Sequence, residues 1–307
     1  MLASVTVRAP AKVNLALGVG PLRPDGYHGL ATVFHAVGIY DDLVATPLPE
    51  GSGLQLVVEG EGAAEVPLDR TNLAARAAAA LEVYGASPDV SIAIRKGIPV
   101  AGGMAGGSAD AAAALVAIDA LFDLGLGRDH LLDIAAALGS DVPFALHGGT
   151  AIGSDTGTQL TTALVRGTYH WVFVLAEEGL PTPLVYREFD RLTAGAPLRE
   201  PVVPDELMAA LRAGDAVALG KALHNDLQRP AVRLRPHLAQ VLSIGHEYGA
   251  LGGIVSGSGP TCAFLARDDE HAVDLAVAFT ASGVCRTVKR AVGPVPGARV
   301  VDQRAGA

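Results

Sequence analysis

Cysteine is nearly absent from the sequence: Cys262 and Cys285 are the only two in 307 residues. Two lone cysteines favour a reduced, cytoplasmic setting in which both thiols are buried. The nine histidines are scattered, and they form neither an HExxH motif nor a pair at metal-ligand spacing. The sequence therefore indicates no metal site by pattern.

Long hydrophobic runs and an excess of basic residues are also missing. The first ten residues, MLASVTVRAP, alternate like a strand and lack the long apolar core of a signal peptide. The longest apolar helical stretch, 111–118, is bracketed by Asp110 and Asp119, so we expect no membrane span. The net charge of −9 argues against nucleic acid, whose binding depends on Lys and Arg. We expect a cytoplasmic protein with neither a membrane nor a nucleic-acid partner, and the sequence specifies no oligomeric state.

Aromatic residues make up only 5% of the chain, but apolar residues make up 50%, much of it alanine. That content is enough to bury a core and is not typical of disorder. A polar stretch without periodicity at 161–167 predicts a boundary between two domains. We therefore predict an N-terminal domain over 1–165, a C-terminal domain over 166–292 and a loosely held tail over 293–307.

Apolar periodicity predicts the main elements of both halves. The first half has expected strands at 5–8, 12–17, 32–39, 54–59 and 90–95, and expected helices at 72–84, 111–122 and 129–138. The second half has expected strands at 171–176, 253–255, 261–265 and 284–289, and expected helices starting at 182 and covering 205–212, 215–227, 236–248 and 269–280. The order strand–helix–strand–strand–helix–strand in the second half suits a ferredoxin-like fold.

The most informative segment is 99–112, PVAGGMAGGSADAA, which joins an expected strand to an expected helix. Its four glycines leave backbone N–H groups unshielded where a helix N-terminus adds partial positive charge. Such a loop is an anion cradle, most often for phosphate. A flexible turn is an equally good interpretation on this segment alone, because the chain has 37 glycines.

Standard nucleotide signatures do not settle the question. Gly102 and Gly107 are spaced as in a Walker loop, but Ser108 stands where that motif requires lysine, and no GxGxxG occurs. An anionic ligand would also be repelled by the net charge of −9, so local cations must reverse the field, and a divalent cation would help. The candidate cations are Lys12, Arg23, Arg95 and Lys96.

Five segments together resemble the GHMP kinases, which phosphorylate small metabolites with ATP. Three match the general motifs of that family: APAKVNLAL (9–17) with DGYH (25–28), the glycine loop, and GGIVSGSGP (252–260). GSDVPF (139–144) and LPTPLVY (180–186) narrow the resemblance to the branch that acts on a cytidyl substrate. The resemblance covers about residues 5–292, and five motifs in the right order are highly specific.

The resemblance implies an α+β, two-domain GHMP kinase fold, with an N-terminal half like domain 2 of ribosomal protein S5 and a ferredoxin-like C-terminal half. The expected reaction is ATP-dependent phosphorylation of the 2-hydroxyl of 4-diphosphocytidyl-2-C-methyl-D-erythritol, with Mg²⁺, in the non-mevalonate isoprenoid pathway. Two alternatives stay open. One is a GHMP kinase of the homoserine or mevalonate type, and the other is a catalytically silent, nucleotide-binding sensor.

Two residues are the expected catalytic pair. The residues alone favour Asp141 as the N-cap of a short helix starting at Val142-Pro143, whereas the resemblance implies a catalytic base. Lys12 alone reads as an exposed strand lysine. The resemblance places it beside Asp141 and the acceptor hydroxyl, where it would keep the carboxylate ionised and stabilise the emerging alkoxide. Asn14 shares the strand face of Lys12 and would hydrogen-bond in the same cleft.

Substrate-binding residues follow from the resemblance in the same way. Tyr27 and Tyr186 would stack on the two faces of the cytosine, and His28 would hydrogen-bond to it. Their alternatives are a turn set by Asp25-Gly26 and, for Tyr186, ordinary helix packing. Asn72 and Lys96 would lie near the adenosine end of ATP. The loop residues assigned to ATP are Pro99, Val100, Ala101, Gly102, Gly103, Met104, Ala105, Gly106, Gly107, Ser108 and Ala109.

One position departs from the family pattern. The cytidyl branch usually has Ser-Ser-Asn after its glycines, whereas this chain has Ser108-Ala109-Asp110. One hydroxyl is missing, which leaves the magnesium ligand open. Asp110 either favours the helix dipole or holds Mg²⁺ through water, and we expect the first.

Overall fold

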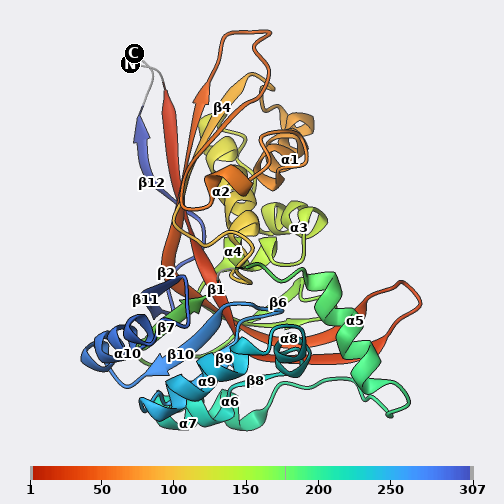
Figure 1. Ribbon diagram of the computed structural model, residues 1–307. Helices are drawn as coiled ribbons and strands as arrows, with labels where there is room; N and C mark the ends of the chain where they lie inside the picture. The colour runs from red at the N-terminus through yellow and green to blue at the C-terminus, as the bar shows by residue number, and fades with distance from the viewer. Residues whose placement is uncertain (1–2, 177, 305–307) are drawn as a thin grey trace.

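Two long neighbouring strands connect the two halves of the molecule. The computed structural model describes residues 3–176 and 178–304, and in it β1 (Ser4–Leu22) pairs antiparallel with β2 (His28–Pro47). Both strands run from the upper half of Figure 1 into the lower half. The sequence predicts shorter strands here, but the structure continues β1 through Pro10 and shifts its register between Pro10 and Ala11. Such a bulge bends a strand, which lets β1 serve both halves.

The sheet of the first half runs in the order β12-β1-β2-β4-β3, and β5, β6 and β8 attach beside this path. Its further strands are β3 (Gln55–Gly60), β4 (Val90–Lys96), β5 (Thr150–Ser154), β6 (Gln159–Thr162), β8 (His224–Asn225) and β12 (Arg299–Arg304). The helical elements of this half are η1 (Ala63–Glu65), α1 (Leu73–Leu81), η2 (Glu82–Tyr84), α2 (Gly106–Leu121), α3 (Arg128–Leu138) and α4 (Val142–His147).

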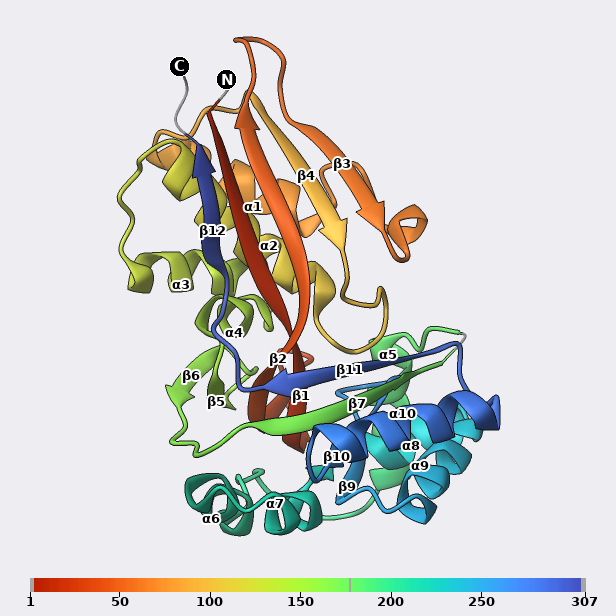
Figure 2. The same cartoon turned by 90° about the vertical axis from the view of Figure 1, so that its left-hand side faces the viewer.

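Helix α2 is the central helix of this half. It packs against α1, β1 and β2, and the helices gather behind the sheet in Figure 2. Most of its buried residues are alanines, whose small side chains let the helix approach its neighbours closely. The glycine loop therefore leads into a helix that is held on several sides.

The second half is built on a four-stranded antiparallel sheet in the order β11-β7-β10-β9. The strands are β7 (Tyr169–Leu175), β9 (Gly252–Val255), β10 (Cys262–Ala266) and β11 (Thr287–Gly293). The helices are α5 (Thr182–Thr193), α6 (Asp205–Ala213), α7 (Ala216–Ala222), α8 (Gln228–Leu234), α9 (His237–Glu247) and α10 (Asp269–Ser282). In chain order the strands of this half are β7, β9, β10 and β11, and in the sheet β7 lies between β11 and β10. This arrangement confirms the ferredoxin-like expectation.

Two expectations about the second half are wrong. The segment 293–307 is not a loosely held tail over its described part, because Arg299–Arg304 pairs as β12 with Ser4–Arg8 of β1. Residues 305–307 lie outside the described ranges. The expected helix 215–227 ends at Ala222, and the two residues of β8 then pair in parallel with β1. Pairing with a distant strand overrides the local helical periodicity.

The core does not follow the proposed domain division. The larger hydrophobic cluster joins the alanines of α2 to Trp171, Phe173 and Leu265 of the second half. The limits 1–165 and 166–292 therefore stay a prediction. No helix within the described ranges is both long and apolar enough to cross a bilayer.

Candidate active site

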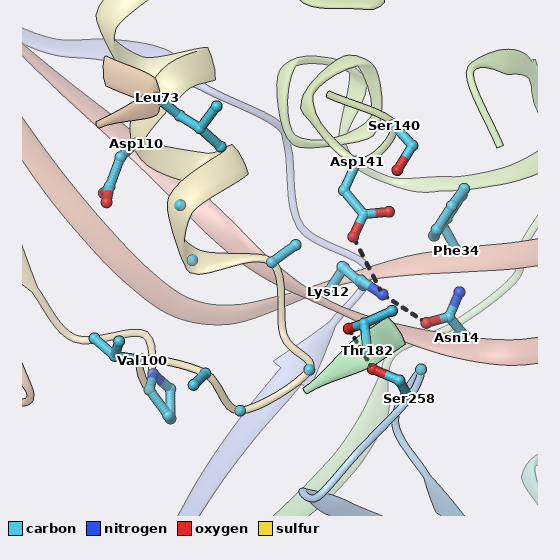
Figure 3. A pocket seen from close by; sticks show the side chains of 18 of the residues that line it. Lys12, Asn14, Phe34, Leu73, Val100, Asp110, Ser140, Asp141, Thr182 and Ser258 are labelled. Carbon is cyan, nitrogen blue, oxygen red and sulfur yellow. Dashed lines mark hydrogen bonds and ion pairs between the residues drawn. The ribbon is translucent and has the colours of Figure 1, made fainter. Parts of the chain in front are cut away.

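A cleft of about 490 Å³ lies between the two halves. It is lined by the glycine loop, by β1 and β2, by the ends of α1 and α4, and by the second half through α5 and the turn after β9. Figure 3 labels ten of these residues, which come from both halves. The five motifs that are far apart in sequence therefore meet at one cavity, apart from the DGYH turn.

Hydrogen bonds to carbonyl oxygens of the glycine loop hold three of the motifs together. The backbone N–H of Lys12 donates to the carbonyl oxygen of Met104 at 3.2 Å, which ties β1 to the glycine loop. Ser256 Oγ donates to the carbonyl of Gly103 at 3.1 Å. A Cβ at Gly257 would lie 3.4 Å from Lys12 Nζ, so this turn lies against the expected catalytic lysine, and its left-handed φ of 58° favours glycine.

The glycine loop has the backbone of an anion cradle. Ala101, Gly103 and Ala105 have positive φ angles of 55°, 70° and 61°. Left-handed backbone at two alanines costs free energy, and such strain typically persists at functional sites. Ala105 occupies the N-cap of α2 and its side chain makes no capping bond, and Gly106 and Gly107 of the first turn line the cleft.

The loop residues assigned to ATP differ in their accessibility. Eight of them line the cleft: Pro99, Val100, Ala101, Gly102, Gly103, Ala105, Gly106 and Gly107. Met104 and Ala109 are fully buried in the core, and Ser108 is outside the described lining. Their part in nucleotide binding stays a prediction.

Lys12 and Asp141 face each other across the cleft, with Lys12 Nζ 3.6 Å from Asp141 Oδ2 (Figure 3). Lys12 also donates to Asn14 Oδ1 at 2.6 Å, which confirms that the two share a strand face. Asn14 donates in turn to Thr32 Oγ1 at 2.8 Å, and this bond fixes the orientation of its amide. Lys12 is buried and Asp141 is part-exposed, so the carboxylate is the more accessible member of the pair.

The expected cap at Asp141 forms only in part. Asp141 occupies the N-cap position of α4, and Pro143 lies in the first turn as expected. Its side chain, however, accepts no capping N–H from the described residues. The carboxylate is therefore available to Lys12 and to the cleft.

Lys96 belongs to a buried ionic cluster. Its ammonium contacts Oδ2 of Asp41 and lies 2.6 Å from Oδ2 of Asp110. Burial raises the pKa of Asp110 to about 8, with the charge of Lys96 opposing the shift and that of Asp41 adding to it. Neither expectation for Asp110 included this pairing with Lys96, and both the dipole role and the water-mediated metal contact stay predictions. Lys96 and Asp110 nevertheless line the cleft.

Asn72 has a structural task beside its position in the cleft lining. Its Oδ1 accepts from the N–H of Ala74 at 2.8 Å, which caps α1, and its Nδ2 donates to the carbonyl of Pro67 at 2.8 Å. The cap fixes the segment that leads into α1 beside the glycine loop. A contact with adenosine stays a prediction.

Of the three residues expected to contact the cytosine, only one is among the described lining residues of the cleft. Tyr186 lines the cleft, and burial, followed by the charge of Asp141, raises the pKa of its phenol to about 12. His28 stacks on Tyr186 with ring centroids 5.4 Å apart, but its Nδ1 contacts the carbonyl of Gly20 at 2.8 Å and its Nε2 lies 3.3 Å from Asp190. Tyr27 is 64% exposed, and neither Tyr27 nor His28 is among the described lining residues.

Comparisons with known proteins agree with this geometry. A model of the GHMP kinase N-terminal domain matches residues 72–149, and a model of the GHMP kinase C-terminal domain matches residues 207–285. The chain is 57% identical to 4-diphosphocytidyl-2-C-methyl-D-erythritol kinase of Streptomyces avermitilis, over 97% of this chain and 100% of that protein. The enzyme of the same name from Mycobacterium tuberculosis is 55% identical, over 97% of this chain and 93% of its own length. The chain belongs to this family of GHMP kinases.

Solved structures support the same conclusion. A crystal structure of 4-(cytidine 5'-diphospho)-2C-methyl-D-erythritol kinase has 35% identity and a TM-score of 0.75, covering 94% of this chain and 98% of its own. A homoserine kinase from Cytophaga hutchinsonii also reaches a TM-score of 0.75, covering 97% of each chain, but at 20% identity it shows the fold alone. The GHMP kinase fold and the family expected from the motifs are both confirmed.

The electrostatics of this GHMP kinase cleft differ from the expectation. Of the four candidate cations, only Lys12 and Lys96 are among the described lining residues, and Lys96 is paired with two carboxylates. Arg23 is paired with Asp25 and Asp155 instead. The ionisable acidic and basic side chains in the lining are Lys12, Lys96, Glu65, Asp110 and Asp141. Even with Asp110 neutral, the two carboxylates match the two ammonium groups, so the protein alone does not make the cleft positive.

Sequence reasoning missed two supporting residues. Asn225 of β8 donates from Nδ2 to the carbonyls of Val255 and Gly257, each at 2.7 Å, and so holds the turn after β9 in place. Nothing near Asn225 in the sequence indicates this contact. Asp41 could have been found, because period-two alternation puts it on the buried face of Ile39 and Leu43, where a lone carboxylate needs a partner.

Proposed function

We propose that the chain transfers the γ-phosphoryl group of ATP to the 2-hydroxyl of 4-diphosphocytidyl-2-C-methyl-D-erythritol, giving ADP and the 2-phosphate. The observation that carries the proposal is the Lys12–Asp141 pair, which faces the same cleft as the glycine loop. Phosphoryl transfer to an alcohol needs positioning, charge neutralisation and a group that accepts the hydroxyl proton. The cleft offers side chains for each of these needs.

Asp141 is the proton acceptor in this mechanism. The 2-hydroxyl gives its proton to the carboxylate as its oxygen forms a bond to the γ-phosphorus, and the bond from that phosphorus to the β-phosphate oxygen breaks. The ammonium of Lys12 stabilises the developing charge on the attacking oxygen. Asn14 positions Lys12 from the other side, through a contact that Thr32 fixes.

The glycine loop is the proposed site of the ATP phosphates. Backbone N–H groups at the start of α2 would donate to phosphate oxygens, and the helix dipole adds partial positive charge. Magnesium would enter as part of the MgATP substrate, because Mg²⁺ in kinase sites is held largely by the substrate phosphates and water. The ion supplies the charge neutralisation that the cleft lacks.

The cytidyl end of the substrate would bind beside α5. Tyr186 lines the cleft there, and His28 packs against its ring. Tyr27 would complete the stacking arrangement from the exposed turn between β1 and β2. A cytoplasmic setting is in keeping with the two free cysteines, Cys262 and Cys285.

An acceptor assay tests the proposal against both alternatives. The protein is incubated with MgATP and, in separate reactions, with the cytidyl substrate, homoserine or mevalonate, while ADP release and product mass are measured. We expect ADP and a phosphorylated product with the cytidyl substrate alone. Turnover of homoserine or mevalonate instead would reassign the acceptor, and nucleotide binding without turnover of any acceptor would identify a sensor.

A further inference from the structure

The buried cluster of Asp41, Lys96 and Asp110 lies directly behind the glycine loop. All three side chains are at most 3% exposed. A Cβ placed on Gly106, the first residue of α2, would lie 3.3 Å from Lys96 Nζ. The cluster is therefore within one helical turn of the backbone N–H groups proposed to hold phosphate.

The two carboxylates of the cluster are not equivalent. Asp41 uses both oxygens: Oδ1 accepts from the N–H groups of Gly97 and Ile98 at 2.7 and 2.9 Å, and Oδ2 contacts Lys96. Asp110 uses only Oδ2, and its buried Oδ1 has no partner among the residues that the structure describes. A proton added to this cluster therefore belongs on Asp110 Oδ1.

The charges around Asp110 favour such a proton. Lys96 on β4 and Asp41 on β2 are the charged groups that act on it, so two carboxylates share one ammonium. Leu73 of α1 and its cap residue Asn72 line the cleft and are uncharged. Glu65 of η1 also lines the cleft and is a further carboxylate. A bound nucleotide would add more negative charge beside the cluster, which stabilises the neutral acid further.

We propose that Asp110 is a neutral acid when nucleotide is bound, with its proton on Oδ1, so that nucleotide binding is linked to proton uptake by the Asp41–Lys96–Asp110 cluster. This inference rests on the proposed binding of ATP in the cleft. A proton on Oδ1 removes the charge from a carboxyl group whose Oδ1 is buried without a partner among the described residues. The two binding equilibria are linked. The factor by which the bound proton raises the affinity for nucleotide equals the factor by which bound nucleotide raises the affinity for the proton.

Calorimetric titration with ADP tests the proposal. At each pH between about 7 and about 9.5, binding is measured in two buffers of different ionisation enthalpy, which gives the protons taken up per nucleotide. Because burial raises the pKa of Asp110 to about 8, little uptake is expected near neutral pH. Above about pH 8 we expect uptake to approach one proton and affinity to fall by up to about tenfold per pH unit.

Matched variants assign the proton. Asp110→Asn keeps the shape of the neutral acid and should bind ADP with no proton uptake and no dependence on pH in this range. Asp133→Asn, which removes an exposed carboxylate from α3, should behave like the unmodified protein. Binding with no uptake at any pH, or uptake that persists in Asp110→Asn, would overturn the inference. Failure to bind nucleotide at all would instead overturn the proposed function.

A second measurement does not depend on the folding of a variant. Infrared difference spectra of the unmodified protein report the C=O band of a protonated carboxylic acid. We expect this band to persist to higher pH with ADP bound than without it. A band that is absent, or that ADP does not affect, would contradict the proposal.

Discussion

The ammonium of Lys12 lies 3.6 Å from the carboxylate of Asp141, although the two residues come from the first strand and from the start of a short helix. A carboxylate at a helix N-cap ordinarily accepts a backbone N–H, and Asp141 accepts none from the described residues. The helix start thus positions Asp141, while its charge is directed at Lys12 and the cleft. This geometry is what a base for an acceptor hydroxyl requires.

The first prediction concerns Asp141→Asn. General-base catalysis contributes about 10²–10⁴ in rate, so kcat for the cytidyl substrate should fall by about that factor. The KM for ATP should change little, because we propose that the side chain contacts the acceptor and not the nucleotide. Steady-state kinetics with both substrates varied measures the two effects.

A stability measurement separates this role from capping. Loss of a cap costs about 0.5–2 kcal/mol, but Asp141 makes no capping bond to a described residue, so the melting temperature should stay nearly unchanged. A variant with nearly normal kcat and a lowered melting temperature would show that Asp141 is only a helix cap.

The sequence indicated the elements and the motifs better than it indicated the electrostatics of the site. Period-two alternation and helical spacing found β4 and α2 because burial on one face leaves a local trace. The ion pair of Asp110 leaves no such local pattern in the sequence. Whether its carboxylate stands free or pairs with Lys96 depends on the arrival of β4 beside α2, a contact between segments. Asn225 was missed for the same reason.

The second prediction tests the glycine loop at Gly103. Its φ of 70° is left-handed, and an added Cβ would lie 2.6 Å from the carbonyl oxygen of Ser256. Left-handed backbone costs an L-residue about 1–2 kcal/mol before the clash is counted, so Gly103→Ala should weaken nucleotide binding about tenfold or more. Calorimetric titration with ADP measures the change, and circular dichroism checks the fold.

Gly125→Ala is the matched control for this substitution. Gly125 has a similar left-handed φ of 65°, an added Cβ there would meet nothing within 4 Å, and the residue is outside the described cleft lining. Nucleotide affinity in this variant should therefore stay within a few-fold of normal. Equal effects at both positions would mean that general loop stability, rather than the backbone of Gly103, controls binding.

The third prediction concerns acid stability and His35. The imidazole is fully buried beside Tyr169 and Trp171, and its Nδ1 contacts Thr150 Oγ1 at 2.8 Å. Burial lowers its pKa from 6.5 to about 3. Between these values the unfolded chain binds a proton that the folded state excludes. The free energy of unfolding should therefore fall as pH drops below about 6.5, by up to about 1.4 kcal/mol per pH unit, and His35 should contribute no slope above that pH.

Urea unfolding at several pH values measures this slope. His35→Gln should unfold with a shallower dependence on pH between about 4 and about 6.5, because the excluded protonation is gone. His237→Gln, which replaces an exposed histidine at the start of α9, should keep the original slope. If all three proteins share one slope, other groups control acid unfolding.

The last prediction concerns the two tyrosines of the cytidyl end. Stacking of a base on an aromatic ring contributes about 1–3 kcal/mol, so Tyr186→Ala should raise the KM for the cytidyl substrate roughly ten- to a hundredfold. Tyr186 already lines the cleft, whereas Tyr27 is 64% exposed in the turn that would have to cover the base. Tyr27→Ala should therefore have an effect of the same kind only if the turn closes on the bound substrate. Tyr84→Ala, at a part-exposed ring that contacts His130 on α3, serves as the control.

The decisive measurement is the pair of KM values in Tyr186→Ala. The KM for ATP should stay unchanged, because we propose that the nucleotide binds at the glycine loop rather than beside α5. Some loss of kcat is also expected, since binding energy from the remote base helps to align the reacting hydroxyl. A raised KM for ATP with a normal KM for the cytidyl substrate would show that Tyr186 contributes to binding ATP and not the cytidyl substrate. That result would remove the stacking argument for a cytidyl acceptor while leaving Lys12 and Asp141 as the phosphoryl-transfer pair.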